Sequence, residues 1–191
     1  MLFRSELAAE TGQVVAAFYN YFSSKDEVLF RIQESAFETM IAAAEEALRA
    51  VSSPRDRMFV FIYQHVRYVA EHPDVMRVLV HEAGTLKARE RLKVRELKER
   101  YYDLGRAIVA ELYREGAPGE LERMTYGIFG MLNWVYGWYD PSRHGSPAEV
   151  ARSLQRLALA GLTGDWRARD SVELERRLSI VPPLPLLREK P

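Results

Sequence analysis

The sequence contains no cysteine. Disulfide bonds and thiolate metal sites are therefore excluded, and a reducing compartment is expected. Neither charge is in excess, because 27 Lys and Arg residues balance 27 Asp and Glu residues. This balance gives no electrostatic support for nucleic-acid binding, although a small basic face on a neutral molecule is compatible with it. No apolar run approaches the roughly 20 residues of a membrane span, and the first residues lack a signal-peptide pattern, so we expect a cytoplasmic protein with no membrane partner.

The sequence is also poor in the residue patterns of catalysis. It has no glycine-rich phosphate loop and no serine-nucleophile motif. Its four histidines show no metal-ligand spacing on which a site can be based; His81 and Glu82, for example, are adjacent and do not share a helix face. We therefore expect no catalytic residue, no metal site, no cofactor and no enzymatic activity. The histidines are His65, His72, His81 and His144.

The chain does contain strong helical periodicity. Its 191 residues, of which 48% are hydrophobic, suit one compact domain or a small domain followed by a medium one. Apolar residues recur at spacings of three and four, and prolines and glycines separate the periodic stretches. The predicted fold is all-α, with about nine helices. The strongest predicted helices cover residues 26–50, 54–71, 73–83, 87–114, 119–139 and 147–162, and a weaker one covers 170–178.

Residues 7–29, LAAETGQVVAAFYNYFSSKDEVL, predict two short helices joined by a turn, followed by the start of a long helix. A glycine at the turn and small residues before it are typical of a helix-turn-helix. Ser24 can cap the long helix, with Glu27 completing a capping box. This stretch resembles the end of the DNA-binding domain of TetR-family repressors. The likeness is carried by Gly12, Phe18, Tyr19, Tyr21, Phe22, Ser24, Lys25 and Leu29.

The resemblance implies a partial helix-turn-helix DNA-binding domain over residues 1–25 and a helical ligand-binding and dimerisation domain over 26–191. The family's first helix has no counterpart before the helix-turn-helix. We therefore expect an N-terminally shortened form, a true start further upstream, or another support for Leu2, Phe3 and Leu7. Valines and alanines at 14–17 stand where the family places polar residues that contact DNA. Alternatively, Tyr19 and Lys25 form an ordinary helix end and cap. The implied DNA-binding residues are Gln13, Val14, Ala17, Tyr19, Asn20 and Lys25, with Tyr19 and Lys25 on phosphates.

Residues 119–139 are apolar nearly all round, so a helix there must be covered nearly all round. A core or pocket on one side and a partner subunit on the other would provide that cover. Together with residues 147–162, this helix predicts a homodimer through the two C-terminal helices, in a four-helix interface.

The segment LNWVYGWYDP, residues 132–141, resembles the equivalent helix of the TetR-family branch that senses acyl-coenzyme A. That likeness implies an elongated apolar cavity, with basic residues among Arg89, Lys93 and Arg95 facing nucleotide phosphates. Alternatively, the tryptophans are core and interface aromatics, residues 87–100 form a solvated face, and His65 is a satisfied core residue. The candidate ligand-binding residues are Phe61, His65, Met76, Leu79, Tyr101, Leu104, Ile108, Tyr126, Phe129, Asn133, Trp134 and Trp138.

These features predict a ligand-responsive transcriptional repressor that binds operator DNA as a homodimer. A small apolar or acyl-CoA-type effector would release it from the DNA. The alternative is a dimeric ligand-binding helical module that has lost DNA binding, because the first helix and the polar groups of the recognition helix are missing.

Overall fold

The computed structural model describes residues 22, 24–81, 86–113 and 118–163. All regular structure in these ranges is helical, which confirms the predicted all-α fold. The residues predicted to bind DNA at positions 13–20, and the predicted helix at 170–178, lie outside them. The elements are α3 (Lys25–Leu48), α4 (Pro54–Glu71), α5 (Pro73–His81), α6 (Ala88–Leu112), α7 (Glu120–Asn133), the 3-10 turn η1 (Val135–Gly137), α8 (Pro141–His144) and α9 (Pro147–Thr163).

The first helices begin where the sequence predicts. The Ser24 hydroxyl accepts a hydrogen bond of 3.1 Å from the Glu27 amide and so caps α3. Acidic residues in the first turn add a favourable interaction with the helix dipole. Pro54 occupies the first turn of α4, where its missing N–H costs nothing. Helix α4 ends at Glu71 because Pro73 cannot continue the hydrogen-bond ladder.

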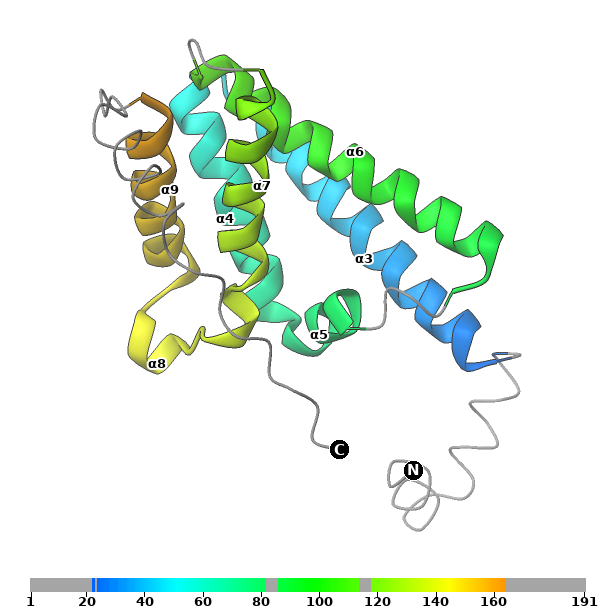
Figure 1. Ribbon diagram of the computed structural model, residues 1–191. Coiled ribbons are helices and arrows are strands. Elements are labelled where there is room, and N and C mark those ends of the chain that lie inside the picture. Colours follow the sequence, from blue (N-terminus) through cyan, green and yellow to red (C-terminus); the bar gives the residue numbers. More distant parts are fainter. Residues whose placement is uncertain (1–21, 23, 82–85, 114–117, 164–191) are drawn as a thin grey trace, which may run out of the picture.

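Helix α4 is the central helix of the body. It contacts α3, α6, α7 and α9, and Figure 1 shows it between α9 and α7. Its apolar face is almost completely buried, as periodicity predicts. The α4 core residues are Met58, Phe61, Ile62, Val66 and Val69.

No helix in the described ranges is long and apolar enough to cross a membrane.

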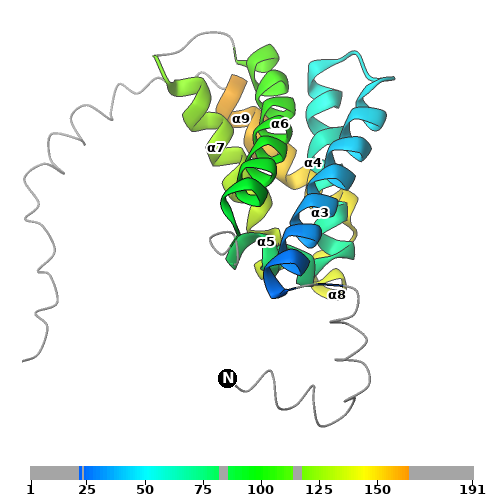
Figure 2. The ribbon, with the colours of Figure 1, turned by 90° about the vertical axis from the view of Figure 1, so that its right-hand side faces the viewer.

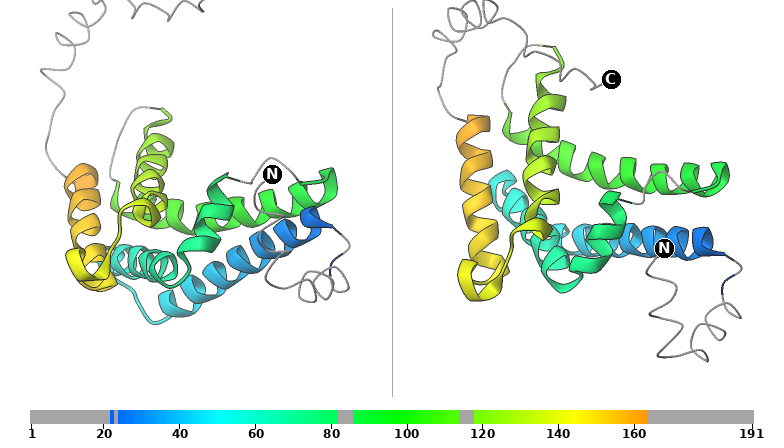
Figure 3. Two further views of the ribbon diagram at one scale, coloured as in Figure 1. Left: turned by 90° about the horizontal axis from the view of Figure 1, so that it is seen from below. Right: turned by 60° about the horizontal axis from the view of Figure 1, so that its bottom comes forward.

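Helices α3 and α6 lie side by side and run in the same direction, and their N-terminal ends project away from the part of the body that holds α9 (Figures 2 and 3). Leu29 and Val94 share a small apolar cluster near their N-terminal ends. Further along, the Lys98 amine lies over the Phe37 ring, at 5.6 Å from its centroid. The position of α3 is therefore set mainly by α6 and α4.

The prediction of one continuous helix over residues 119–139 is wrong beyond Asn133. Helix α7 ends at Asn133, and one turn of 3-10 helix follows at Val135–Gly137. There the Gly137 amide bonds to the Trp134 carbonyl at 3.0 Å, three residues back. Aromatic, β-branched and glycine residues give this segment low helix propensity, and the tighter turn buries Val135 completely. The short helix α8, which the sequence did not predict, is capped by Asp140.

Gly105 allows α6, α4 and α7 to meet closely. A Cβ atom at this position would lie 2.9 Å from Phe129 Cε2 on α7 and 3.0 Å from Phe61 Cζ on α4. Both rings also pack against Tyr101, so neither is free to withdraw. The glycine therefore sets how closely the aromatic rings approach the α6 backbone.

This packing predicts that Gly105→Ala destabilises the protein. Alanine normally stabilises a helix interior by up to about 1 kcal/mol relative to glycine. At position 105 we expect a net loss of about 1–2 kcal/mol, because the two rings must shift. Urea denaturation at fixed protein concentration measures the difference. Gly161→Ala is the matched control, because among the described residues its Cβ meets only the Met124 methyl group, at 3.4 Å. Equal stability of the two variants would contradict the prediction.

Candidate ligand cavity

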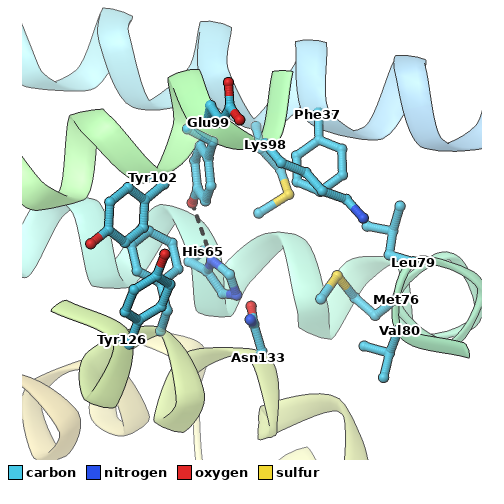
Figure 4. Close-up of a pocket in the computed structure, with 13 residues that line it drawn as sticks. Phe37, His65, Met76, Leu79, Val80, Lys98, Glu99, Tyr102, Tyr126 and Asn133 are labelled. Carbon is cyan, nitrogen blue, oxygen red and sulfur yellow. Dashed lines mark hydrogen bonds between the residues drawn. The ribbon is translucent and has the colours of Figure 1, made fainter. Parts of the chain in front are cut away.

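A cavity of about 520 Å³ lies between α3, α4, α5, α6 and α7 (Figure 4). Its wall is mainly aliphatic and aromatic, with a few polar groups, as in small-molecule sites. The lining residues are Phe37, Met40, His65, Met76, Leu79, Val80, Lys98, Glu99, Tyr101, Tyr102, Tyr126, Phe129 and Asn133.

Helical spacing explains why these residues share one wall. Side chains three and four positions apart lie on the same face of a helix. Helix α7 contributes Tyr126, Phe129 and Asn133, which follow that spacing, and α3 contributes Phe37 and Met40 one turn apart. Each of these helices therefore turns one stripe toward the cavity and packs with the rest of its apolar surface.

Aromatic rings form the wall between α6 and α7. Tyr102 stacks on Tyr126 with ring centroids 4.9 Å apart, and Phe129 packs edge-on against Tyr101 at 5.9 Å. Phe61 stacks behind Tyr101 at 5.2 Å. Such pairs add to the free energy of burial and hold the rings in defined orientations. This side of the cavity is therefore preorganised.

His65 is the most deeply buried polar group of the wall, with 1% of its surface exposed. Its Nδ1 lies 3.1 Å from the Tyr101 hydroxyl, which is also buried. Its Nε2 has no hydrogen-bond partner among the described residues. Burial lowers the pKa of His65 to about 4 and raises the pKa of Tyr101. Both side chains are therefore uncharged at neutral pH.

Lys98 supplies a positive charge to the wall. Within the described ranges it has no carboxylate partner at salt-bridge distance, and the neighbouring Glu99 pairs with Arg95 at 3.4 Å. Burial lowers the pKa of Lys98, because part of its side chain lies against the Phe37 ring. The cavity thus combines an apolar wall, one neutral buried imidazole, one lysine and the carboxylate of Glu99.

Residues 51–162 match the protein family described as "Tetracyclin repressor-like, C-terminal domain". This match spans more than half of the chain. The protein belongs to the TetR family of transcriptional regulators. Members of this family regulate transcription and are not enzymes, so the predictions of family and of a non-enzymatic protein are confirmed.

Solved structures of TetR-family regulators share the fold. PfmR from Thermus thermophilus is 31% identical, with a TM-score of 0.69; the match covers 82% of this chain and 86% of PfmR. FadR from Bacillus subtilis, solved with stearoyl-CoA, is 19% identical with a TM-score of 0.62, covering 82% and 87%. AibR, solved with isovaleryl coenzyme A and operator DNA, is 18% identical with a TM-score of 0.66, covering 80% and 84%. No curated protein matches the sequence.

Seven of the twelve residues predicted to bind ligand lie on the wall of this TetR-family cavity. The structure brings together residues from four helices that are far apart in the sequence, although whether they bind a ligand remains a prediction. These residues are His65, Met76, Leu79, Tyr101, Tyr126, Phe129 and Asn133.

The other five predicted residues do not line the cavity. Phe61 and Ile108 are buried in the core, and Leu104 lines a separate surface depression. Trp134 is 62% exposed, and Trp138 packs edge-on against His144. The two tryptophans are assigned to the cavity because residues 132–141 resemble a helix of the acyl-CoA-sensing branch, but α7 ends at Asn133 and neither tryptophan lines the cavity.

Sequence reasoning missed part of the wall, and Lys98 above all. The mixed charges of residues 87–100 predict a solvated face, and the basic residues proposed there, Arg89, Lys93 and Arg95, are absent from the cavity wall. Lys98 lies three residues before Tyr101, which is the signal that places it on the same face. Lys25, the one predicted DNA contact within the described residues, is exposed at the start of α3. The other missed residues are Phe37, Met40, Val80, Glu99 and Tyr102.

The burial of His65 predicts a pH-dependent stability. In the unfolded chain histidine binds a proton below pH about 6.5, whereas folded His65 does so only near pH 4. The unfolded state therefore binds more protons in this window, and the free energy of unfolding falls as pH falls. From pH 7 to pH 5 we expect a loss of about 2 kcal/mol from this group.

Urea denaturation at the two pH values, at one protein concentration, checks this expectation. His65→Gln should remove most of the loss, and His72→Gln, at an exposed histidine, should keep it. The same pH dependence in wild type and His65→Gln would show that His65 is not the group responsible.

Proposed function

We propose that this TetR-family regulator is a repressor that binds operator DNA as a homodimer and is released by an acyl-coenzyme A effector. The observation that supports this most is the apolar cavity between α3 and the rest of the body. Residues 1–25, the proposed DNA-binding segment, lead directly into α3. A ligand in this cavity contacts the helix that connects to the DNA-binding segment.

The proposed release mechanism uses Phe37 and Met40. Both residues project from α3 into the cavity wall, while the opposite wall is held by the aromatic stack of α6 and α7. A bound acyl chain pushes against α3 more readily than against this stack. The ligand shifts the equilibrium only if it binds one position of α3 more tightly than the other. The released state is the one in which the two DNA-binding segments no longer match successive major grooves.

The acyl-CoA class is supported by the cavity and by two relatives. An aliphatic and aromatic wall suits an acyl chain, and about 520 Å³ lies within the size range of small-molecule sites. FadR and AibR, which share the fold, were solved with stearoyl-CoA and isovaleryl coenzyme A. Lys98 offers a positive charge for the anionic part of such a ligand.

The proposed dimer interface involves α7 and α9. Gly127, Gly130 and Trp134 lie three and four residues apart on one exposed face of α7, and a Cβ at either glycine would have no atom of the described residues within 4 Å. Leu157 on the neighbouring α9 is 62% exposed. Small and apolar residues together suit the close approach of a second copy, whose twofold symmetry pairs each helix with its equivalent.

The effector proposal predicts stabilisation and release by acyl-CoA thioesters. The first experiment compares isovaleryl-, octanoyl- and stearoyl-CoA by the shift in melting temperature that each causes. The second incubates the protein with fragments of genomic DNA at two salt concentrations and measures which fragments are retained, with and without each thioester. At least one thioester should raise the melting temperature and release bound fragments. Leu79→Trp, which fills the cavity, should bind DNA but resist release, whereas Leu92→Trp, at an exposed leucine of α6, should behave as wild type.

Two results would overturn parts of this proposal. If no fragment is retained at low salt while a thioester still stabilises the protein, the chain is a ligand-binding module without DNA binding. If fragments are retained but no thioester has an effect, the acyl-CoA effector is wrong.

The dimer proposal predicts that Leu157→Arg dissociates the protein. Charged side chains at the centre of a symmetric interface meet their own copies, and the repulsion adds to the cost of burying them. Sedimentation velocity should show a dimer for wild type and a monomer, or at least a tenfold weaker dimer, for the variant. Leu92→Arg on α6 is the matched control and should remain dimeric; dissociation of both variants, or of neither, would argue against this interface.

A further inference from the structure

The unpartnered nitrogen of His65 points to a specific chemical group in the ligand. In Figure 4 the His65 ring lies between Lys98 and Asn133, with its free nitrogen directed toward the Asn133 side, and no hydrogen bond joins these two described residues. Buried polar groups without a partner are rare in native proteins and costly. A buried nitrogen aimed into a ligand cavity is satisfied when the ligand supplies the missing group.

The contact with Tyr101 determines which proton the ring carries. If the tyrosine hydroxyl donates to Nδ1, the only unsatisfied donor of the pair is the Nε2–H. If Nδ1–H donates instead, the tyrosine hydroxyl hydrogen and the Nε2 lone pair both lack partners, because the described part of the chain gives the Tyr101 hydroxyl no second hydrogen bond. Each unsatisfied buried group raises the free energy of the folded protein. The first arrangement leaves fewer such groups, so Nε2 carries the proton and is a donor.

A neutral donor of this kind suits a neutral acceptor. A carboxylate placed against His65 would lose its hydration without gaining an opposite charge there, which is unfavourable. An ester, thioester or amide carbonyl needs only the hydrogen bond. The positive charge of the wall lies elsewhere, because the Lys98 amine is beside Phe37 and Leu79 in Figure 4.

We propose that His65, held in one tautomer by Tyr101, donates its Nε2–H to the carbonyl oxygen of the acyl ligand, so that the effector is recognised through a neutral carbonyl group. This inference rests on the proposed function, since it assigns a role within the same cavity. Tyr101 is a positioning residue that acts through His65. The apolar wall accepts the chain, and His65 distinguishes a thioester from a ligand of the same shape that has no carbonyl.

The test compares each thioester with its thioether analogue. Isovaleryl-, octanoyl- and stearoyl-CoA are paired with S-isopentyl-, S-octyl- and S-octadecyl-CoA, which keep the chain and the nucleotide but lack the carbonyl oxygen. Affinities are measured by titration below the micelle concentration. For at least one pair, the wild type should bind the thioester roughly three- to tenfold more tightly, the range expected for one net hydrogen bond.

Substitutions at His65 and Tyr101 test whether His65 causes the tighter binding of the thioester. His65→Leu should bind the two members of a pair within about twofold of each other. His65→Gln, which keeps an N–H near the position of Nε2, should retain part of the preference. Tyr101→Phe should reduce the preference, because the tautomer is no longer fixed. His72 does not line the cavity, so His72→Leu should keep the full preference. The melting temperature of each variant reports its folding.

The outcomes separate this inference from the proposed function. Equal binding of thioester and thioether to the wild type would overturn the carbonyl contact and leave the acyl-CoA effector standing. A preference that survives unchanged in His65→Leu would show that another group makes the contact. Failure of both series to bind would overturn the acyl-CoA effector and the carbonyl contact together.

Discussion

The burial of α4 is the constraint on which the rest of this structure depends. An apolar face as wide as that of α4 is stable only when several helices cover it, and α3, α6, α7 and α9 provide this cover. Ile62, Val66 and Val69 meet these neighbours in a closely packed core. His65 lies on the same helix but faces a region where α5, α6 and α7 do not close against each other. The core and the cavity are thus adjacent regions around one helix, and the core fixes the geometry of the cavity.

The two sides of the cavity differ in how firmly they are held. On one side, Gly105 lets Phe61 and Phe129 approach the α6 backbone, and their contacts with Tyr101 leave little freedom for any of the rings. On the other side, the Phe37 ring of α3 meets the Lys98 side chain, and no ring–ring contact of Phe37 occurs among the described residues. Well-packed interfaces change by discrete steps rather than by continuous deformation. A displacement caused by a ligand is therefore expected at α3, the helix that follows the proposed DNA-binding segment.

Much of this architecture could be predicted from the sequence, because helical periodicity and capping are local properties. Ser24, Pro54 and Pro73 mark helix boundaries for reasons that need no tertiary information. Periodicity also predicts which residues are buried, but it does not distinguish a residue that meets another helix from one that meets a cavity. Lys98 shows the difficulty, since its position on the wall depends on the parallel packing of α6 beside α3. The end of α7 before Trp134 was missed because that segment has the apolar pattern of a helix but a low intrinsic helix propensity.

The balance between apolar and polar groups in the cavity explains how such a site can be selective. Burial of a hydrocarbon chain contributes free energy in proportion to its area and discriminates poorly between chains of similar size. A buried polar group without a protein partner adds a directional requirement, because only a ligand that supplies the matching group gains a net hydrogen bond at that position. His65 is such a group, since it is 1% exposed and its Nε2 has no partner within the described part of the chain. The aliphatic and aromatic wall therefore sets how tightly a ligand of the right size is held, while the single buried imidazole sets which chemical class is held best.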